Sequence, residues 1–183
     1  MKICVTGASG KAGQAVVAEL AGHGYQVHAT DLARPAPGSP ADGWKVMFTQ
    51  SDMTDYGQAA EVLAGMDGVV HLANIPAPGL RPPAVTFNEN MTMNYNVFSS
   101  AAVTAGLSRV VWASSETTLG LPFDTPPPYA PIDEAHYPYP TTSYALSKVA
   151  SETVAEQIAA WSGLPFVALR FSNVMDVADY QAF

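Results

Sequence analysis

Short apolar runs alternate along the chain with longer stretches of helical character. Six runs are rich in Val, Ile, Phe and Ala and are bounded by polar or glycine-containing segments, as expected of strands buried on both faces. These predicted strands are residues 2–6, 26–31, 45–52, 68–74, 109–115 and 165–173. The predicted helices lie near residues 12–22, 55–65, 88–105 and 144–161. Strands separated by helices indicate βαβ units, so the pattern predicts an α/β fold with a doubly wound parallel sheet.

Two segments rich in Pro and Gly interrupt this alternation. The stretch RPAPGSPADG at 34–43 is predicted to be a surface connection. The stretch at 121–140 is too long for an ordinary link between a strand and a helix, so it is predicted to be a functional loop stiffened by its prolines. An unstructured insertion is the alternative interpretation of this second stretch.

Composition narrows the class of protein. The chain has 183 residues, of which 48% are apolar and 13% charged, so it can build one well-packed domain and is too apolar for disorder. Its net charge is −8 and its basic residues are scattered, which argues against nucleic acid or an anionic membrane as a partner. Small molecules or other proteins are expected instead. No apolar run approaches about 18 residues and no signal-peptide core is found, so a cytoplasmic protein is expected.

The string VTGASGKAG joins the first predicted strand to the first predicted helix. Gly7 permits a tight turn, Gly10 lets a phosphate approach the backbone, and Gly13 allows the helix to pack closely on the strand. A nucleoside-triphosphate P-loop is disfavoured, because Val5 and Ala12 stand where that loop needs a glycine and a hydroxyl residue. The pattern therefore predicts a pyrophosphate site at a helix N-terminus.

Acidic residues follow the second and third predicted strands. Asp31 can accept hydrogen bonds from an adenosine ribose and would repel a 2′-phosphate, which favours NAD over NADP. Arg34 could instead reach such a phosphate, or lie solvated in its loop. Asp52 is placed to contact the adenine amino group, with Met53 beside the ring, whereas a helix cap is the alternative role for Asp52.

Tyr144 and Lys148 stand four positions apart at the start of the last predicted helix. Residues at this spacing lie on one helix face, so the phenol and the ammonium project into the same space. An adjacent positive charge lowers the pKa of a phenol and makes it a better proton acceptor. The pair alone could still be a coincidence of composition.

Five strings, TGASGKAG, SDMTD, HLAN, ASSETTLG and YALSK, stand in one order on this pattern of strands and helices. Together they resemble the extended short-chain dehydrogenase/reductase family, the NAD-dependent sugar epimerase/dehydratase group. The resemblance implies an NAD(P)-binding Rossmann domain over residues 1–176, with residues 177–183 beginning a substrate-binding region that is truncated or missing. It also implies hydride transfer between NAD and a carbinol of a sugar, a sugar acid or a nucleotide sugar, and it allows a homodimer.

The resemblance further implies roles for single residues. Tyr144 would be the proton acceptor, Lys148 would lower its pKa and bind the nicotinamide ribose, and Ser115 would orient the substrate oxygen. Glu116 and Asn173 would contact the substrate together with Ser115. The remaining cofactor-binding residues would be Gly7, Ser9, Gly10, Lys11, Ala12, Gly13, Asp31, Asp52, Met53, Leu72, Ala73, Asn74 and Asn90.

The chain departs from the family pattern in two respects. Thr117 replaces the glutamate base that follows the acidic residue, here Glu116, in dehydratases, so dehydration is disfavoured. The chain is also shorter than is usual for the family, and a non-catalytic NAD(P)-binding sensor or scaffold module is therefore the alternative function. No metal site is expected, because His71 and His136 have no clustered ligand partners.

Overall fold

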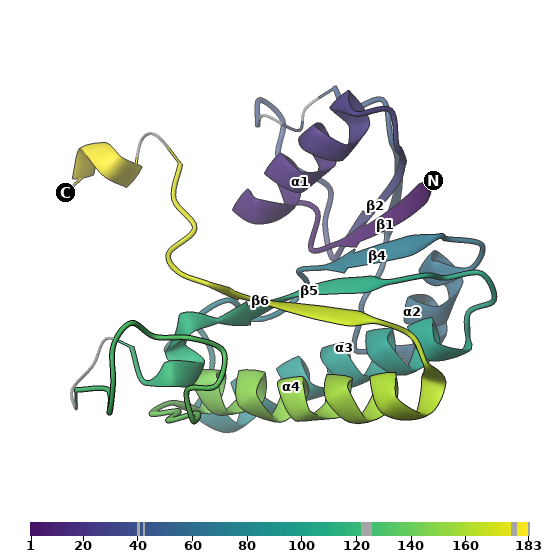
Figure 1. Cartoon of the computed structure of the whole chain (residues 1–183). Coiled ribbons are helices and arrows are strands. Elements are labelled where there is room, and N and C mark those ends of the chain that lie inside the picture. Colours follow the sequence, from purple (N-terminus) through teal and green to yellow (C-terminus); the bar gives the residue numbers. More distant parts are fainter. Residues whose placement is uncertain (40, 42, 122–125, 177–178, 183) are drawn as a thin grey trace.

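The computed structural model describes residues 1–183 except 40, 42, 122–125, 177–178 and 183. Its centre is a six-stranded sheet with the order β3-β2-β1-β4-β5-β6, in which each neighbouring pair is parallel (Figure 1). The strands are β1 (Lys2–Thr6), β2 (Gln26–Asp31), β3 (Met47–Gln50), β4 (Gly68–His71), β5 (Val110–Ser115) and β6 (Phe166–Phe171). The helices are α1 (Lys11–Gly22), α2 (Tyr56–Leu63), α3 (Pro83–Val103) and α4 (Ser143–Ser162), with 3-10 turns η1 (Glu116–Leu119) and η2 (Asp179–Ala182). The predicted doubly wound parallel sheet is confirmed.

The direction of strand addition reverses between β1 and β4. From β1 the chain builds outward through β2 and β3, then returns to the other side of β1 and builds through β4, β5 and β6. The connections that leave β1 and β4 therefore diverge, and a crevice is left at the carboxyl ends of these two strands. Thr6 and His71 are paired as their last residues and are buried beneath that crevice.

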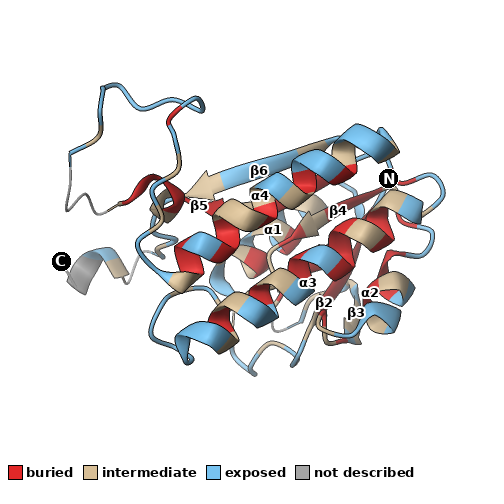
Figure 2. Ribbon diagram, turned by 90° about the horizontal axis from the view of Figure 1, so that it is seen from below, coloured by how far each residue is buried: buried red, intermediate tan, exposed pale blue. Residues whose placement is uncertain are grey.

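Helices cover the two faces of the sheet unequally. On one face α2, α3 and α4 enclose the larger apolar core, and the buried sides of α3 and α4 face each other and the sheet (Figure 2). On the other face α1 packs against β1 and β2. Phe166 of β6 points into the larger core, so the alternating residues Val167 and Leu169 face the side of α1, where they are 37% and 39% exposed.

Local signals set where the helices begin and end. The side chain of Thr142 accepts a backbone hydrogen bond in the first turn of α4, and Gly163 ends that helix in the left-handed conformation. Helix α3 begins at Pro83, earlier than predicted, because proline suits the first helical turn. Asp55 caps α2, so the alternative that Asp52 is the cap is wrong.

Two predicted segments lie partly outside the described residues. Residues 122–125 of the predicted functional loop 121–140 are not described, and the described residues of this loop do not line the pocket at the crevice. In the predicted start of a substrate-binding region, 177–183, residues 179–182 form η2 and the others are not described.

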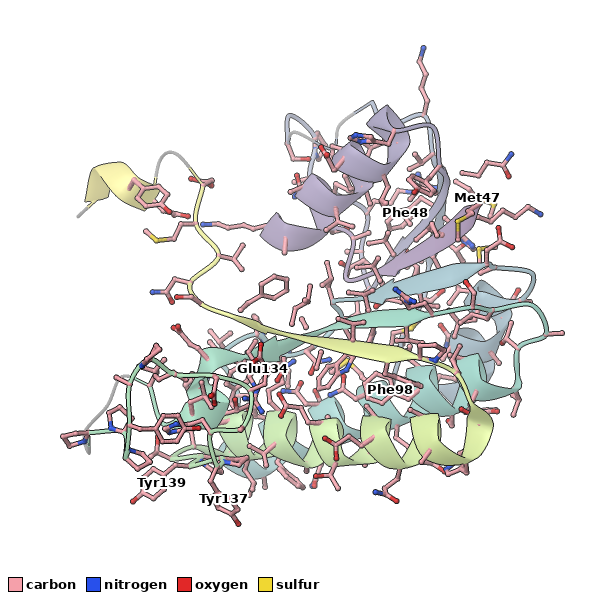
Figure 3. The ribbon with its side chains drawn as sticks, in the orientation of Figure 1. Met47, Phe48, Phe98, Glu134, Tyr137 and Tyr139 are labelled. Carbon is pink, nitrogen blue, oxygen red and sulfur yellow. The ribbon has the colours of Figure 1, made fainter. Side chains whose placement is uncertain are left out.

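Phe98 of α3 lies at the centre of the larger core (Figure 3). Its ring packs edge-on against Trp112 and Phe166, with centroids 5.1 and 5.2 Å away. Phe98→Ala leaves a cavity there, so we expect the free energy of unfolding, measured with denaturant, to fall by about 3–5 kcal/mol. Tyr95→Ala on the same helix is the matched control, because Tyr95 is 55% exposed. The control should cost less than about 0.5 kcal/mol, and equal losses for both variants would contradict this account of the core.

Candidate active site

A pocket of about 910 Å³ opens at the carboxyl ends of the strands, beside the glycine-rich turn and the first two turns of α4. Nearly all the residues predicted to form the site line this pocket, and Asn90 is the exception. The lining residues predicted from the sequence are Gly7, Ser9, Gly10, Lys11, Ala12, Gly13, Asp31, Asp52, Met53, Leu72, Ala73, Asn74, Ser115, Glu116, Tyr144, Lys148 and Asn173. Residues from most of the chain therefore converge on one site.

Close backbone contacts require two glycines of the turn after β1. Gly7 has a φ of +68°, and a Cβ there would lie 2.6 Å from the backbone nitrogen of Ala73. A Cβ on Gly13 would lie 2.1 Å from the carbonyl oxygen of Gly7, so α1 could not keep its position. Gly10 differs, because its nearest contact would be 3.4 Å and no side chain caps the helix that it begins. The space over Gly10 and the uncapped N-terminus of α1 form a cradle for an anion.

Lys11, the first residue of α1, points toward the C-terminal segment. Its ammonium donates to the carboxylate of Asp179 and lies 3.8 Å from that of Asp176. The Lys11 side chain is 53% exposed, so it lies at the rim of the pocket. Exposed pairs of this kind contribute little to stability.

Asp31 at the end of β2 is held by backbone donors. One carboxylate oxygen accepts from the nitrogen of Ser9 at 2.8 Å, and the other accepts from that of Leu32 at 2.7 Å. The Arg34 guanidinium lies over the ring of Phe48 in β3, 5.1 Å from its centre (Figure 3 labels Phe48). Of the two charged groups, the Asp31 carboxylate lines this end of the pocket and the Arg34 guanidinium does not.

Asp52 and Met53 form the wall beyond β3. The Oδ1 atom of Asp52 accepts hydrogen bonds from the backbone and the hydroxyl of Thr54, both at 2.8 Å. Asn96 of α3 supports this turn, since its Nδ2 donates to the carbonyl oxygens of Met53 at 3.0 Å and Thr54 at 2.9 Å. A buried side chain of α3 thus fixes the backbone of the predicted site residue Met53 and of Thr54 beside it.

Tyr144 and Lys148 project from one face of α4 into the inner end of the pocket, as their spacing predicts. Lys148 is only 2% exposed and donates to Asn74 Oδ1 at 2.9 Å and to the Ala113 carbonyl oxygen at 2.8 Å. The Lys148 Nζ atom lies 5.6 Å from the centre of the Tyr144 ring. The lysine is therefore held by oxygens from β5 and from the segment after β4 while it lies beside the phenol.

Burial raises the pKa of the Tyr144 phenol, and the Ser115 hydroxyl beside it lowers that pKa only in part. The net shift of the Tyr144 pKa is therefore upward, and the expected lowering is wrong. The reason is that burial disfavours the charges of both groups. Ser115 itself ends β5, is buried, and accepts a hydrogen bond from the Thr117 hydroxyl at 2.9 Å.

Glu152 follows Lys148 by one turn of α4 and was missed in the sequence analysis. Burial lowers the pKa of Lys148 to about 7, and the Glu152 carboxylate acts in the opposite direction. Arg170 donates to the two oxygens of Glu152 at 3.0 and 2.8 Å, and the Ser114 hydroxyl donates to one of them at 2.5 Å. The i+4 spacing from Lys148 is the signal that could have found it, since the same spacing singled out Tyr144.

Asn90 is fully buried and supports the pocket from behind. Its Oδ1 accepts from the backbone nitrogen of Ile75 at 2.8 Å, and its Nδ2 donates to the Ile75 carbonyl oxygen at 3.2 Å. The same Nδ2 contacts Ser147 Oγ of α4 at 3.3 Å, and one turn later Asn94 donates to Ser151 Oγ at 2.7 Å. The matching four-residue spacings of Asn in α3 and Ser in α4 are the sequence signal for this helix pair.

Comparison with known proteins finds relatives over nearly the whole chain. It is 30% identical over 178 residues to a UDP-glucose 4-epimerase of Lacticaseibacillus casei, a match that covers 95% of this chain and 52% of that relative. It is 28% identical over 183 residues to an NAD-dependent glucose-6-phosphate dehydrogenase of Haloferax volcanii, covering 94% of this chain and 68% of the relative. A solved short-chain dehydrogenase/reductase superfamily protein from Agrobacterium tumefaciens with bound NAD has a TM-score of 0.82 and 26% identity, over 96% of this chain and 50% of that one.

The sequence profile of the NAD dependent epimerase/dehydratase family matches residues 3–176. The chain nevertheless spans only about half the length of the first relative. Within the described residues, no helix combines the length and apolar character needed to cross a membrane.

The family's cofactor, NAD, is the one expected from the glycine turn and Asp31. The fold, the order of the motifs and the profile agree, and the chain belongs to the NAD dependent epimerase/dehydratase family.

Proposed function

We propose that this chain binds NAD in the pocket and transfers hydride between the nicotinamide and a carbinol of a sugar, a sugar acid or a nucleotide sugar. The observation that carries the proposal is the convergence of the glycine turn, Asp31, Ser115, Tyr144 and Lys148 on one pocket. A site that only held a dinucleotide would need an anion cradle and a ribose acceptor. It would not need a buried phenol beside a buried amine, and that pair is suited to moving a proton.

The pocket residues fit NAD from end to end. The space over Gly10 and the uncapped N-terminus of α1 suit a pyrophosphate. Asp31 at the end of β2 suits the hydroxyls of the adenosine ribose. At the inner end, Asn74 and Lys148 offer an amide and an ammonium to the nicotinamide ribose.

NAD, when bound, supplies the site that accepts or donates hydride. During oxidation the substrate hydroxyl must lose a proton, and we assign the Tyr144 phenol as its acceptor. Because burial raises the pKa of Tyr144, forming the phenolate needs a nearby positive charge. Protonated Lys148 provides that charge from the same helix face, 5.6 Å from the ring centre. The Ser115 hydroxyl beside the phenol orients the substrate oxygen.

The substrate class follows from the polar residues near the phenol. Glu116, Thr117 and Asn173 line this part of the pocket and suit a ligand rich in hydroxyl groups. Thr117 uses its hydroxyl to donate to Ser115 and supplies no base, which disfavours dehydration. The relatives named above, a UDP-glucose epimerase and a glucose-6-phosphate dehydrogenase, agree with a sugar-type substrate and leave epimerisation and oxidation both open.

A non-catalytic NAD-binding module is the second candidate, because the space over Gly10 and the Asp31 carboxylate would serve cofactor binding alone equally well. Incubation with NAD and a panel of UDP-sugars, sugar acids and sugar phosphates separates the two, with NADH absorbance and sugar products both followed. Turnover of any of them supports an enzyme. NAD binding by calorimetry without product from any of them identifies the binding module, and no NAD binding overturns both.

Tyr144→Phe should reduce turnover by about 10²- to 10⁴-fold, because it removes only the proton acceptor. Its NAD dissociation constant should stay within about threefold of the parent, since the ring still packs. Lys148→Ala should weaken both turnover and NAD binding. Single-turnover rates and calorimetry measure the two effects, and a Tyr144→Phe enzyme within a few-fold of the parent would refute the role of the phenol.

Asp31→Asn should shift the preference between cofactors toward NADP by roughly tenfold, about 1.4 kcal/mol. The amide keeps an oxygen for the backbone nitrogen of Ser9, gives up the hydrogen bond from the nitrogen of Leu32, and removes the charge that would repel a 2′-phosphate. Arg34→Ala is the companion variant, because Arg34 is stacked over Phe48 and should change the ratio little. Calorimetric titration of NAD and NADP gives the ratio, and a parent that binds NADP at least as tightly would mean that Arg34 governs the choice.

Lys148 should make stability depend on pH. Its folded pKa of about 7 lies below the ordinary value of 10.5, so the unfolded chain binds more protons between these pH values. The titration of Lys148 therefore lowers the free energy of unfolding as pH falls from 10.5 toward about 7, and raises it again as pH rises. Lys148→Met removes the titration, so the parent's free energy of unfolding minus the variant's should rise by at least about 1 kcal/mol between about pH 7 and 10. Urea unfolding at several pH values measures this difference, and a flat difference would place the lysine pKa near its ordinary value.

A further inference from the structure

A chain of buried polar side chains runs beneath the pocket floor, and His71 is at its centre. His71 ends β4 and is 1% exposed. One of its ring nitrogens, Nδ1, lies 2.6 Å from the Thr6 hydroxyl, and the other, Nε2, lies 2.9 Å from Asn94 Oδ1. Asn74 donates to the same Asn94 oxygen at 2.7 Å and receives Lys148 at 2.9 Å. The chain therefore connects the strand before the glycine turn to the buried lysine.

Lys148, at one end of this series of buried side chains, determines the direction of every hydrogen bond in the series. An ammonium has only donors, so the amide of Asn74 must turn its oxygen toward Lys148 and its nitrogen toward Asn94. Asn94 must then present its oxygen, which leaves its nitrogen for Ser151 at 2.7 Å. The same oxygen faces His71 Nε2, so Nε2 carries the hydrogen.

The remaining nitrogen of His71 is therefore an acceptor. Nδ1 receives the hydrogen of the Thr6 hydroxyl, and the Thr6 oxygen in turn accepts from the backbone nitrogen of Ala73 at 3.3 Å. If the ring were protonated, Nδ1 would also carry a hydrogen, and the Thr6 hydroxyl would have to accept this hydrogen bond in place of donating it. Burial lowers the pKa of His71 to about 3, which keeps the ring neutral across the working range of pH.

We propose that His71 is a positioning residue that orients Asn94 and Asn74, and through them the Lys148 ammonium. The proposal rests on the proposed function, in which Lys148 serves the cofactor and the phenol. His71 itself is not among the residues that line the pocket, so it acts only through these partners. If its ring hydrogen is removed, Asn94 Oδ1 keeps only Asn74 as a donor and is held less firmly. The oxygen that Asn74 presents to Lys148 is then less precisely placed.

The test compares His71→Phe, which keeps a ring, with His71→Gln, which keeps a donor and an acceptor. The matched control is His28→Phe on β2. His28 is also a buried strand histidine, and it bonds to the hydroxyl of Thr49, which takes no part in the hydrogen bonds around His71. His71→Phe should raise the NAD dissociation constant and lower kcat by about tenfold each, with the sugar KM little changed. His71→Gln should recover both to within about threefold, and His28→Phe should match the parent in both.

Nitrogen-15 NMR of the histidine rings tests the hydrogen-bond order without any cofactor. The His71 ring should be neutral and carry its hydrogen on Nε2 down to about pH 5. A hydrogen on Nδ1, or a protonated ring at that pH, overturns the proposal whether or not the chain turns over a substrate. Equal NAD affinity and kcat in His71→Phe and the parent also overturn it. If the parent binds NAD without turnover, the proposed function fails, while the NAD affinities of these variants still decide the role of His71.

Discussion

The burial of one lysine is the constraint on which the rest of the site depends. An ammonium removed from water costs several kcal/mol unless oxygens replace its hydration. Lys148 is 2% exposed and meets this requirement with Asn74 Oδ1 and the carbonyl oxygen of Ala113. The Ala113 carbonyl belongs to a central strand and cannot move alone. Helix α4 must therefore lie at one height over β5, and that height also sets where the Tyr144 phenol enters the pocket.

Helix α3 holds α4 at this height through polar pairs in an otherwise apolar interface. Asn90 meets Ser147 and Asn94 meets Ser151, one turn apart on both helices. The small serine side chains allow the two helices to approach closely. A shift of one turn would pair one asparagine with the other serine and leave the second buried amide without its serine, at a cost of about 1–3 kcal/mol. These pairs therefore specify the register of the helices more sharply than apolar contacts alone would.

The strands, the parallel topology and the glycine turn could be predicted from the sequence because each is encoded locally. An apolar run predicts a strand wherever it lies, and Gly7 is required by its own φ of +68°. The partners of Lys148 could not be predicted in this way, since Asn74 lies 74 residues away and reaches it only through the fold. The hydrogen bonds around His71, which were not predicted, and the wrong direction for the pKa of Tyr144 have the same origin. Both depend on burial and on partners that no local pattern reveals.

The glycine turn and the groups to which we assign proton transfer both depend on one short segment, residues 72–74. The backbone of Ala73 packs against Gly7, and Asn74 holds Lys148. A displacement of this segment would move the glycine turn, over which the pyrophosphate is proposed to lie. It would also move the Lys148 amine beside the Tyr144 phenol. The cofactor binding and the proton transfer that we propose would thus be coupled through the backbone. Glu116 and Asn173, the proposed substrate contacts, lie after β5 and β6, outside that segment. Substitutions at these two positions would therefore leave the geometry of the glycine turn and the buried lysine unchanged.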